Sequence, residues 1–537
     1  MSARTATAAS LRGRRPSAVL GALAAVTVGA ALLPLAYLVI RALGADAEAR
    51  EAVRPGPTLR LVLDTVLLLA GVVAVATVVG TVLAWLVVRT DLPLRRLWGV
   101  ALTLPLVIPS YVAALILLGA LGPRGLLQDA LEPLGVERLP DLYGYDGALL
   151  ALTLSTYPYV FLIAAAALRS VDASVEEAAR SLGRGPLRVF LTVTVPTLRP
   201  ALGAAGLLVS LYVLADFGAV SLMQYPTLTR AVYLQYESLL DREAAAILAL
   251  VLVALAAVVV WLEGRVRRGA AFYRVSPGAG RRGTTVALGR WRWPATAFCA
   301  AVAGLFLALP LGVLAWWTAE GIGVGSPFRL AWEAALDSAL ASGAAAAAAA
   351  VAVLPVAVLS WRWPTWPARL LERLAYVPNA VPGIAVALAL VFLGARYGGV
   401  LYQSLGMLVF AYVVRFMPQA LATTRSSLAL VDPRLEEASR SLGRRPTRTL
   451  VSVVLPLARP GILAGAALVF LSAMKELPAT LLLRPIGFDT LATEIWTDTS
   501  IGAYSDAAPS ALLLIAVSAP FVWALSARRA WELGTPG

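Results

Sequence analysis

Twelve apolar stretches run along the 537-residue chain, and each is long enough to cross a lipid bilayer as a helix. A crossing helix needs about 20 mostly apolar residues, and backbone exposed to lipid must satisfy its hydrogen bonds internally. The stretches therefore predict an all-α integral membrane protein with twelve transmembrane helices. Their approximate limits are 18–44, 61–88, 97–121, 148–168, 201–223, 244–262, 295–318, 334–360, 374–395, 400–424, 461–483 and 508–527.

The first apolar stretch follows Arg12, Arg14 and Arg15, as the core of a cleaved signal peptide would. A signal-peptide core has only about 7–15 apolar residues. Because this stretch is much longer, we expect an uncleaved first span.

Several kinds of chemistry are excluded by the residues that the chain lacks. Histidine is absent and Cys299 is the single cysteine, which excludes disulfides, zinc fingers and histidine-based catalysis. The single lysine, Lys475, does not follow a glycine run, so the chain has no G-x-x-x-x-G-K-[ST] phosphate-binding loop. We expect no metal site and no cofactor bound by this chain; any ATP and Mg²⁺ would bind to another subunit.

The charged residues behind the net charge of +14 are distributed among the loops as expected for a membrane protein. Lys and Arg are enriched in cytoplasmic loops. If the amino terminus is cytoplasmic and the spans alternate, the stretch 265–292 is cytoplasmic, and it holds eight arginines and no acid. The stretch 122–147 lies on the other side and holds five acids against two arginines. We therefore predict that both termini are cytoplasmic, and nucleic acid is not needed to explain the charge.

The chain contains an internal repeat, which is a strong guide to architecture. Residues 171–200 and 431–460 are identical at 16 of 30 positions without a gap. The repeat predicts two halves, 1–275 and 276–537, with six spans each and the same orientation, as parallel repeats. Further matches upstream are Arg89 with Arg362, Pro105 with Pro378 and Pro109 with Pro382.

Each copy of the repeated loop is typical of a short helix that ends at a glycine. An aspartate caps the helix, a glutamate and an arginine four residues apart can pair on what we expect to be an exposed face, and a glycine can adopt the left-handed conformation that ends it. A solvated connector is the alternative, but two near-identical loops favour a shared task. The residues are Asp172, Glu176, Arg180, Gly183 and Pro196, and then Asp432, Glu436, Arg440, Gly443 and Pro456.

This loop resembles the EAA loop of bacterial ABC importer permeases, whose pattern is E-A-A, three residues, G, nine residues and I-x-L-P. The first copy reads Glu177-Ala178-Ala179, Gly183, Val193 and Val195-Pro196; the second reads Glu437-Ala438-Ser439, Gly443, Val453 and Leu455-Pro456. The departures from the pattern are conservative. The resemblance covers nearly the whole chain and implies a MetI-like permease fold in a fused, two-half form.

In that family the EAA loop is the coupling helix, which docks in a cleft of a separate ATP-binding subunit. The resemblance implies two copies of a cytoplasmic ABC ATPase and a periplasmic or lipid-anchored binding protein, which would dock on 122–147 and 484–507. It implies a multi-pass permease of the bacterial plasma (inner) membrane that works by alternating access and is not itself an enzyme. The coupling residues would be Glu177, Ala178, Gly183, Pro196, Glu437, Ala438, Gly443 and Pro456.

Three charged residues are predicted at membrane depth, where ionisable groups are costly and often functional. Asp216 and Glu476 occupy equivalent positions in the fifth span of each half, and Arg415 lies near the middle of the tenth span. One hypothesis is that they line the translocation path and ease the passage of a cation. The alternative is structural: Glu476 pairs with Lys475 or Arg415, and Asp216 caps or cross-links helices.

The cargo is indicated by resemblance alone. Asp216-Phe217-Gly218 and the segment 475–485 are similar to segments of ferric iron importer permeases, which makes ferric iron the first choice. Thiamine permeases share the fused architecture and size. A secondary transporter driven by an ion gradient, or a membrane scaffold or receptor, remains as a rival class.

Overall fold

The computed structural model describes residues 17–123, 125–136, 138–170, 173–237, 241–268, 285–323 and 331–531. This part is helical, and its β pairing is an isolated bridge between Thr90 and Val286. It holds twelve helical segments that are long and apolar enough to cross a membrane. The predicted all-α membrane fold is therefore confirmed. The predicted cap Asp172 and the arginines at 274, 281 and 282 lie outside the described residues.

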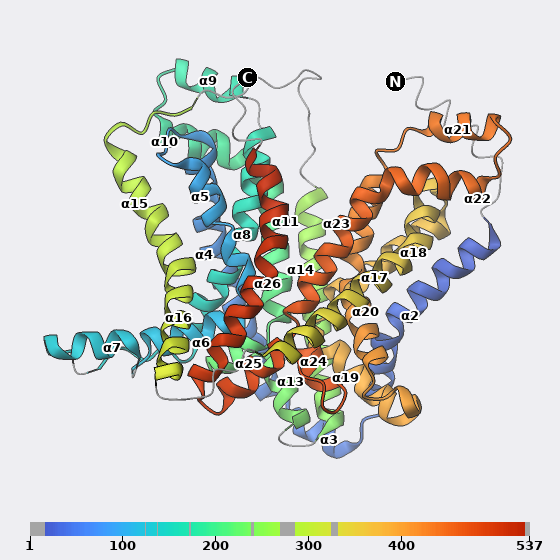
Figure 1. Ribbon diagram of the computed structural model, residues 1–537, viewed down its shortest axis with the longest axis horizontal. Helices are drawn as coiled ribbons and strands as arrows, with labels where there is room; N and C mark the ends of the chain where they lie inside the picture. Colours follow the sequence, from blue (N-terminus) through green and yellow to red (C-terminus); the bar gives the residue numbers. More distant parts are fainter. Residues whose placement is uncertain are drawn as a thin grey trace. The chain divides into compact units, whose positions relative to one another are not determined.

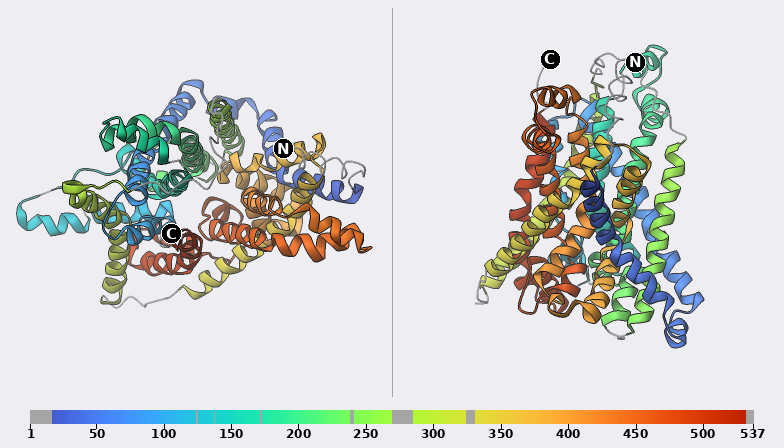
Figure 2. Two further views of the ribbon diagram at one scale, coloured as in Figure 1. Left: turned by 90° about the horizontal axis from the view of Figure 1, so that it is seen from above. Right: turned by 90° about the vertical axis from the view of Figure 1, so that its right-hand side faces the viewer.

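The helices form two compact units, which Figure 1 and Figure 2 show in three views. The first unit contains the described residues within 1–45 and 332–490, and the second contains those within 46–331 and 491–537. These units do not coincide with the sequence halves. The first span lies in the unit built mainly from the second half, and the spans at 289–323 and 504–523 lie in the unit built mainly from the first half. The division of the sequence at 275/276 stays a prediction about the repeat.

The first unit contains five of the candidate spans, which lie in α2, α17, the α19 region, α20 and the η10–α23 region. Helix α17 packs against α20 and α23, and α2 packs on α17 and α19. Its helices are α2 (Ala18–Leu43), α17 (Trp332–Arg362), α18 (Trp366–Ala375), η7 (Val377–Ala380), α19 (Gly383–Leu393), η8 (Gly394–Gly398), η9 (Gly399–Leu401), α20 (Leu405–Leu428), α21 (Pro433–Ser441), α22 (Pro446–Thr449), η10 (Leu450–Val454), α23 (Leu455–Met474) and α24 (Pro478–Leu483).

The second unit repeats the same core, because α4 packs against α8 and α11 as α17 packs against α20 and α23. Helix α16 packs against α26. Its helices up to Arg268 are α3 (Ala47–Ala52), α4 (Pro55–Arg89), α5 (Arg95–Ala101), η2 (Leu104–Val107), α6 (Ser110–Leu121), α7 (Leu126–Leu131), η3 (Glu132–Leu134), α8 (Tyr145–Ser170), α9 (Ala173–Ser181), α10 (Pro186–Val189), η4 (Phe190–Thr194), α11 (Val195–Ala215), α12 (Gly218–Leu222), α13 (Leu228–Glu237) and α14 (Arg242–Arg268). Those after it are η5 (Gly289–Trp291), α15 (Arg292–Ala303), η6 (Gly304–Ala308), α16 (Leu309–Gly323), α25 (Leu491–Ser500) and α26 (Tyr504–Trp531).

Small residues let the core helices approach closely. A Cβ atom at Gly80 of α4 would lie 2.9 Å from the carbonyl oxygen of Tyr157 in α8. In the other unit, a Cβ atom at Gly465 of α23 would lie 2.9 Å from the Cα atom of Ala420 in α20. Since lipid tails are as apolar as leucine, close backbone packing of this kind is what holds membrane helices together.

The third span of each half begins later than predicted, because two prolines interrupt it. The sequence predicts spans at 97–121 and 374–395, but α6 starts at Ser110 and α19 at Gly383. Pro109 and Pro382 are the N-caps of these helices. A residue before proline is driven out of the helical region, and the preceding residues Ile108 and Val381 are extended, with ψ of 118° and 120°. A short 3-10 turn precedes each break.

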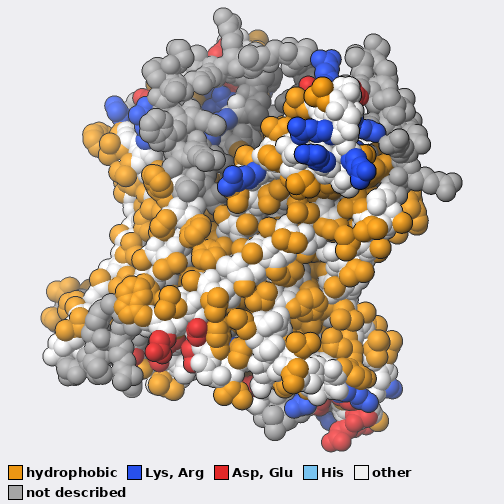
Figure 3. Space-filling view, turned by 45° about the vertical axis from the view of Figure 1, so that its right-hand side comes forward, with side chains coloured by type: hydrophobic (Ala, Val, Ile, Leu, Met, Phe, Trp, Pro, Cys, Tyr) orange, Lys and Arg blue, Asp and Glu red, His pale blue; other side chains and the backbone are white. Residues whose placement is uncertain are grey.

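The surface agrees with a membrane protein. On the face drawn in Figure 3, hydrophobic side chains cover a broad middle zone, and the charged side chains lie mainly toward its two ends. In the second unit, α7 extends away from α6 in both Figure 1 and Figure 2. This helix belongs to the longer loop of the first half, 122–147.

Candidate functional site: paired loops and interrupted helices

Each EAA loop contains the predicted short helix, and a glycine follows it. Helix α9 ends at Ser181 and α21 at Ser441, and the glycines two residues later, Gly183 and Gly443, have φ of +78° and +79°. The amide of Gly183 donates to the carbonyl of Arg180 (2.8 Å), and the amide of Arg184 donates to that of Ala179 (3.3 Å). This pair of bonds is the Schellman motif, in which a left-handed residue closes a helix. Figure 1 shows α9 and α21 beyond the ends of the long helices of their units.

Each of the helices α9 and α21 has an outer and an inner face. Glu177 and Ala178 are exposed, as are Glu437 and Ala438 in the second loop. The third residue of the E-A-A pattern faces inward, since Ala179 and Ser439 are buried. Ser439, which departs from the pattern, exchanges a hydrogen bond of 3.0 Å with the hydroxyl of Thr449, so its extra oxygen is satisfied within the loop.

The preceding glutamates, Glu176 and Glu436, are buried, which corrects the expectation that they pair on an exposed face. The predicted i,i+4 partner is present in the first loop, where an Arg180 nitrogen lies 3.7 Å from a Glu176 oxygen. Burial is tolerated because an arginine from another helix lies beside each carboxylate and carries the opposite charge. The repeat aligns Arg89 with Arg362 and Glu176 with Glu436. This alignment alone does not predict that the arginine and the glutamate of each half are in contact.

In each loop this arginine comes from the last turn of a helix that is distant in the sequence. Arg89 ends α4 and lies 3.8 Å from Glu176, and the Thr194 hydroxyl donates to the same carboxylate oxygen at 2.9 Å. In the other unit, Arg362 ends α17 and donates a hydrogen bond to Glu436. All four charged side chains are at most 8% exposed. The same buried pair is thus built twice from different residues of one chain.

The prolines predicted at the start of the next span, Pro196 and Pro456, lie one residue inside α11 and α23. Each follows a π-helical turn, η4 or η10. Proline has no amide hydrogen to donate, so a helix that continues through it must rearrange its hydrogen bonds, and a π-turn is one such arrangement. The loop therefore runs into the span as a continuous but locally widened helix.

The two equivalent carboxylates lie at breaks in the fifth and eleventh spans. Helix α11 ends at Ala215, and Asp216 follows it; α23 ends at Met474, two residues before Glu476. An Asp216 oxygen accepts from the amides of Ala219 (3.0 Å) and Val220 (3.4 Å), and Ser110 donates to its other oxygen. Asp216 thus caps the short helix α12, in agreement with the structural alternative.

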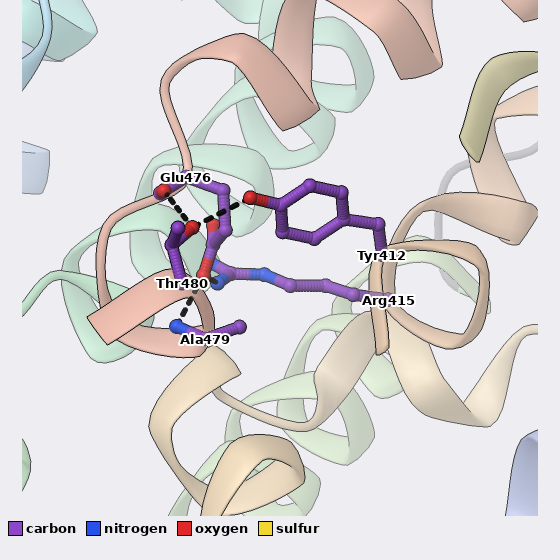
Figure 4. Close-up of polar contacts among 5 residues, drawn as sticks. All are labelled: Tyr412, Arg415, Glu476, Ala479 and Thr480. Carbon is purple, nitrogen blue, oxygen red and sulfur yellow. Dashed lines mark hydrogen bonds and ion pairs between the residues drawn. The ribbon is translucent and has the colours of Figure 1, made fainter. Parts of the chain in front are cut away.

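Glu476 is held by a larger polar cluster, drawn in Figure 4. Arg415 of α20 donates to one Glu476 oxygen, which also accepts from the amide of Ala479 at 3.2 Å. The Tyr412 and Thr480 hydroxyls share a hydrogen bond of 2.6 Å beside this pair. Arg415 and Glu476 are therefore partners, and the pair links α20 to the start of α24. Whether either side chain contacts cargo stays a prediction.

The two carboxylate sites differ at matching positions of the repeat. Gly383 corresponds to Ser110, and Arg415 corresponds to Ser155. A Cβ atom at Gly383 would lie 1.7 Å from an Arg415 nitrogen and 2.9 Å from a Glu476 oxygen. The second half therefore needs glycine where the first half uses a serine hydroxyl, because an arginine fills the space.

We expect Gly383→Ser to destabilise the protein. The new side chain would push the guanidinium away from Glu476 and leave a buried ion pair broken, a change that costs about 3–5 kcal/mol when no relief is available. The triple variant Gly383→Ser, Arg415→Ser, Glu476→Asp rebuilds the first-half site and should recover most of the loss. Unfolding in detergent measures both, and equal stability of Gly383→Ser and the unsubstituted protein would contradict the assignment.

The predicted docking segments carry acidic side chains. In the second unit, burial and the neighbouring Asp498 raise the pKa of Glu494, and burial and Asp506 raise the pKa of Asp498. In the first unit, Arg484 pairs with Asp489. Among the described residues, no group of three or more Cys, Asp or Glu side chains could hold a metal ion.

Comparison with known proteins shows a family model and several permeases that this chain is similar to. Residues 56–271 and 354–530 match the family model of the binding-protein-dependent transport system inner membrane component. The Fe(3+)-transport system permease protein FbpB 2 of Haemophilus influenzae is 32% identical over 90% of this chain and 93% of its own length. The ferric transport system permease protein FbpB of Actinobacillus pleuropneumoniae is 25% identical over 86% of this chain and 70% of its own length. The molybdenum transport system permease protein ModB of Escherichia coli is 36% identical over 26% of this chain and 60% of its own length.

The two matched segments hold one EAA loop each, and every loop presents the exposed glutamate and alanine of the pattern on a glycine-closed helix. The chain therefore belongs to the inner-membrane components of binding-protein-dependent transport systems, of which it carries two copies fused in one polypeptide.

Proposed function

We propose that this permease imports ferric iron, which an extracytoplasmic binding protein delivers and a separate ATPase drives through the membrane. The cargo is supported by two relatives that span most of the chain and are named as ferric iron permeases. The molybdenum permease matches only about a quarter of the chain. No bond in the cargo is made or broken, so the chain acts as a path and not as an enzyme.

The proposal is supported most directly by the two coupling helices, α9 and α21, whose outer faces are exposed. Two loops of the same geometry call for two equivalent docking partners, so two copies of a cytoplasmic ABC ATPase subunit would bind one complex. ATP and Mg²⁺ would be held by that subunit. The arginine-rich connection at 265–292 supports a cytoplasmic location for the loops and both termini. The bilayer would be the bacterial plasma membrane.

The proposed cycle is alternating access. Closure of the two ATPase subunits on ATP moves the coupling helices together and turns the permease outward, so that cargo passes from the docked binding protein. Hydrolysis returns it to the inward-facing state. Each step needs only a difference in free energy between two conformations of the permease, and the carboxylates Asp216 and Glu476 keep the helix breaks intact while the halves move.

Reconstitution in lipid vesicles tests this function. We expect ferric iron uptake only when the permease, its cognate ATPase, the iron-loaded binding protein and ATP are all present, with none on a non-hydrolysable ATP analogue. Uptake without the ATPase, driven by an ion gradient, would favour a secondary transporter. ATP-driven uptake of thiamine or molybdate, with no uptake of iron, would show that the cargo assignment is wrong and leave the ATP-driven mechanism standing.

A further inference from the structure

Arg89 and Arg362 are buried arginines at the ends of α4 and α17. Each lies on the second span of its half and reaches a glutamate that immediately precedes the E-A-A pattern. The residues of the second pair are 74 positions apart in the chain. Two copies of such a contact, each nearly inaccessible to solvent, indicate a shared task beyond filling space.

The coupling helices are otherwise packed on their own loops. Helix α9 packs on α10 and η4, which directly follow it, and α21 packs on α22 and η10 in the same way. A helix that touches mainly its own flanking segments can tilt without moving the bundle. The Arg89–Glu176 and Arg362–Glu436 pairs supply a link to a distant element of the same unit.

Neighbouring residues on each coupling helix face opposite ways. Glu176 is buried against Arg89, while Glu177 is exposed, and Glu436 and Glu437 repeat the arrangement. An ATPase that binds the exposed face would therefore act on the helix from the side opposite the ion pair. Since α4 packs on α8 and α11, and α17 packs on α20 and α23, each linked span belongs to the core of its unit.

We infer that Arg89 and Arg362 are positioning residues that fix each coupling helix to the second span of its half, so that movement imposed on the loop is passed to the core helices. This inference rests on the proposed function. A buried pair is suited to the task because moving its members apart would leave an uncompensated charge in a dry environment. The two helices must therefore move together.

The test compares Arg89→Met/Arg362→Met with Arg89→Lys/Arg362→Lys. Both replacements keep an unbranched chain, but only lysine keeps the charge. In reconstituted vesicles we expect the methionine variant to hydrolyse ATP within about twofold of the unsubstituted rate while iron uptake per ATP falls about tenfold, a coupling loss of about 1.4 kcal/mol. The lysine variant should recover at least half of the ratio.

A second readout needs no partner protein. Amide hydrogen exchange over 173–181 and 433–441 should be at least several-fold faster in the methionine variant, because the loops are released from the spans. The matched control is Arg425→Met, which removes a pair with Glu372 that is only partly buried and links α20 to α18. This control should change neither the uptake ratio nor exchange in the two loops.

Unchanged uptake per ATP in the methionine variant of an active complex would overturn the inference and leave the proposed function standing. Equal losses in the lysine and methionine variants, with lower melting temperatures in both, would also overturn it, because the pair would then be a folding requirement alone. If the unsubstituted complex shows no ATP-driven uptake, the proposed function fails and the inference fails with it.

Discussion

Arg415→Leu should lower the free energy of unfolding by about 3–5 kcal/mol, because it leaves the Glu476 carboxylate buried without its cation. Glu476 is 5% exposed and Arg415 is 17% exposed, so solvent offers little compensation. The loss would loosen the link between α20 and α24 at the interrupted span. Denaturant titration of the purified protein in detergent micelles measures the change.

Two variants control this result. Arg415→Leu/Glu476→Gln removes the orphaned charge and keeps an acceptor for the Ala479 amide, so most of the stability should return. Arg484→Leu removes the pair with Asp489, whose side chains are 31% and 56% exposed, and should cost less than about 1 kcal/mol. A loss below about 1 kcal/mol in Arg415→Leu would show that the pair does not hold this part of the fold.

Gly183→Val/Gly443→Val should abolish ATP-driven uptake while the protein still folds. A side chain at positive φ costs roughly 1–2 kcal/mol at each site, and each 1.4 kcal/mol changes a population tenfold. Both coupling helices would therefore lose the turn that ends them. No atom lies within 4 Å of a Cβ added at either glycine, so the effect comes from the backbone and not from a clash.

Gly185→Val is the matched control for this second result. Gly185 lies in the same loop, a Cβ there would meet no atom within 4 Å, and the equivalent residue of the second loop is Arg445. Uptake in this variant should match that of the unsubstituted protein. Full uptake in the double valine variant would contradict the role of the two loops.

The parts of the fold that depend on local sequence were predictable. Apolar length places the twelve spans, and the repeat at 171–200 and 431–460 identifies the loops. Gly183 and Gly443 have the positive φ that their position after a short helix predicts. These features depend on residues that are close in the chain, which is why sequence patterns reveal them.

The parts that depend on distant contacts were missed. The spacing of Glu176 and Arg180 does not indicate that Arg89 also reaches the Glu176 carboxylate. The sequence therefore predicts this glutamate on an exposed face, although it is buried. The breaks before Ser110 and Gly383 were hidden because apolar residues continue through them, although Pro109 and Pro382 were matched by the repeat. The packing of the first span on α17 and α19 joins segments about 300 residues apart, which no periodicity reports.

We expect the two EAA loops to be the docking sites of the ATPase, and site-directed cross-linking tests this expectation. Cys299 is the single cysteine and is buried, so Cys299→Ser provides a background in which one thiol can be placed at will. A reagent that joins this thiol to lysines of the ATPase would meet one lysine in the permease itself, Lys475.

Ala178→Cys and Ala438→Cys should each give a covalent permease–ATPase product, while Val400→Cys and Ile486→Cys, at positions that are 96% and 91% exposed, should give none. Absence of a product from both alanine positions in a complex that contains the ATPase would contradict the account, as would equal products from all four positions.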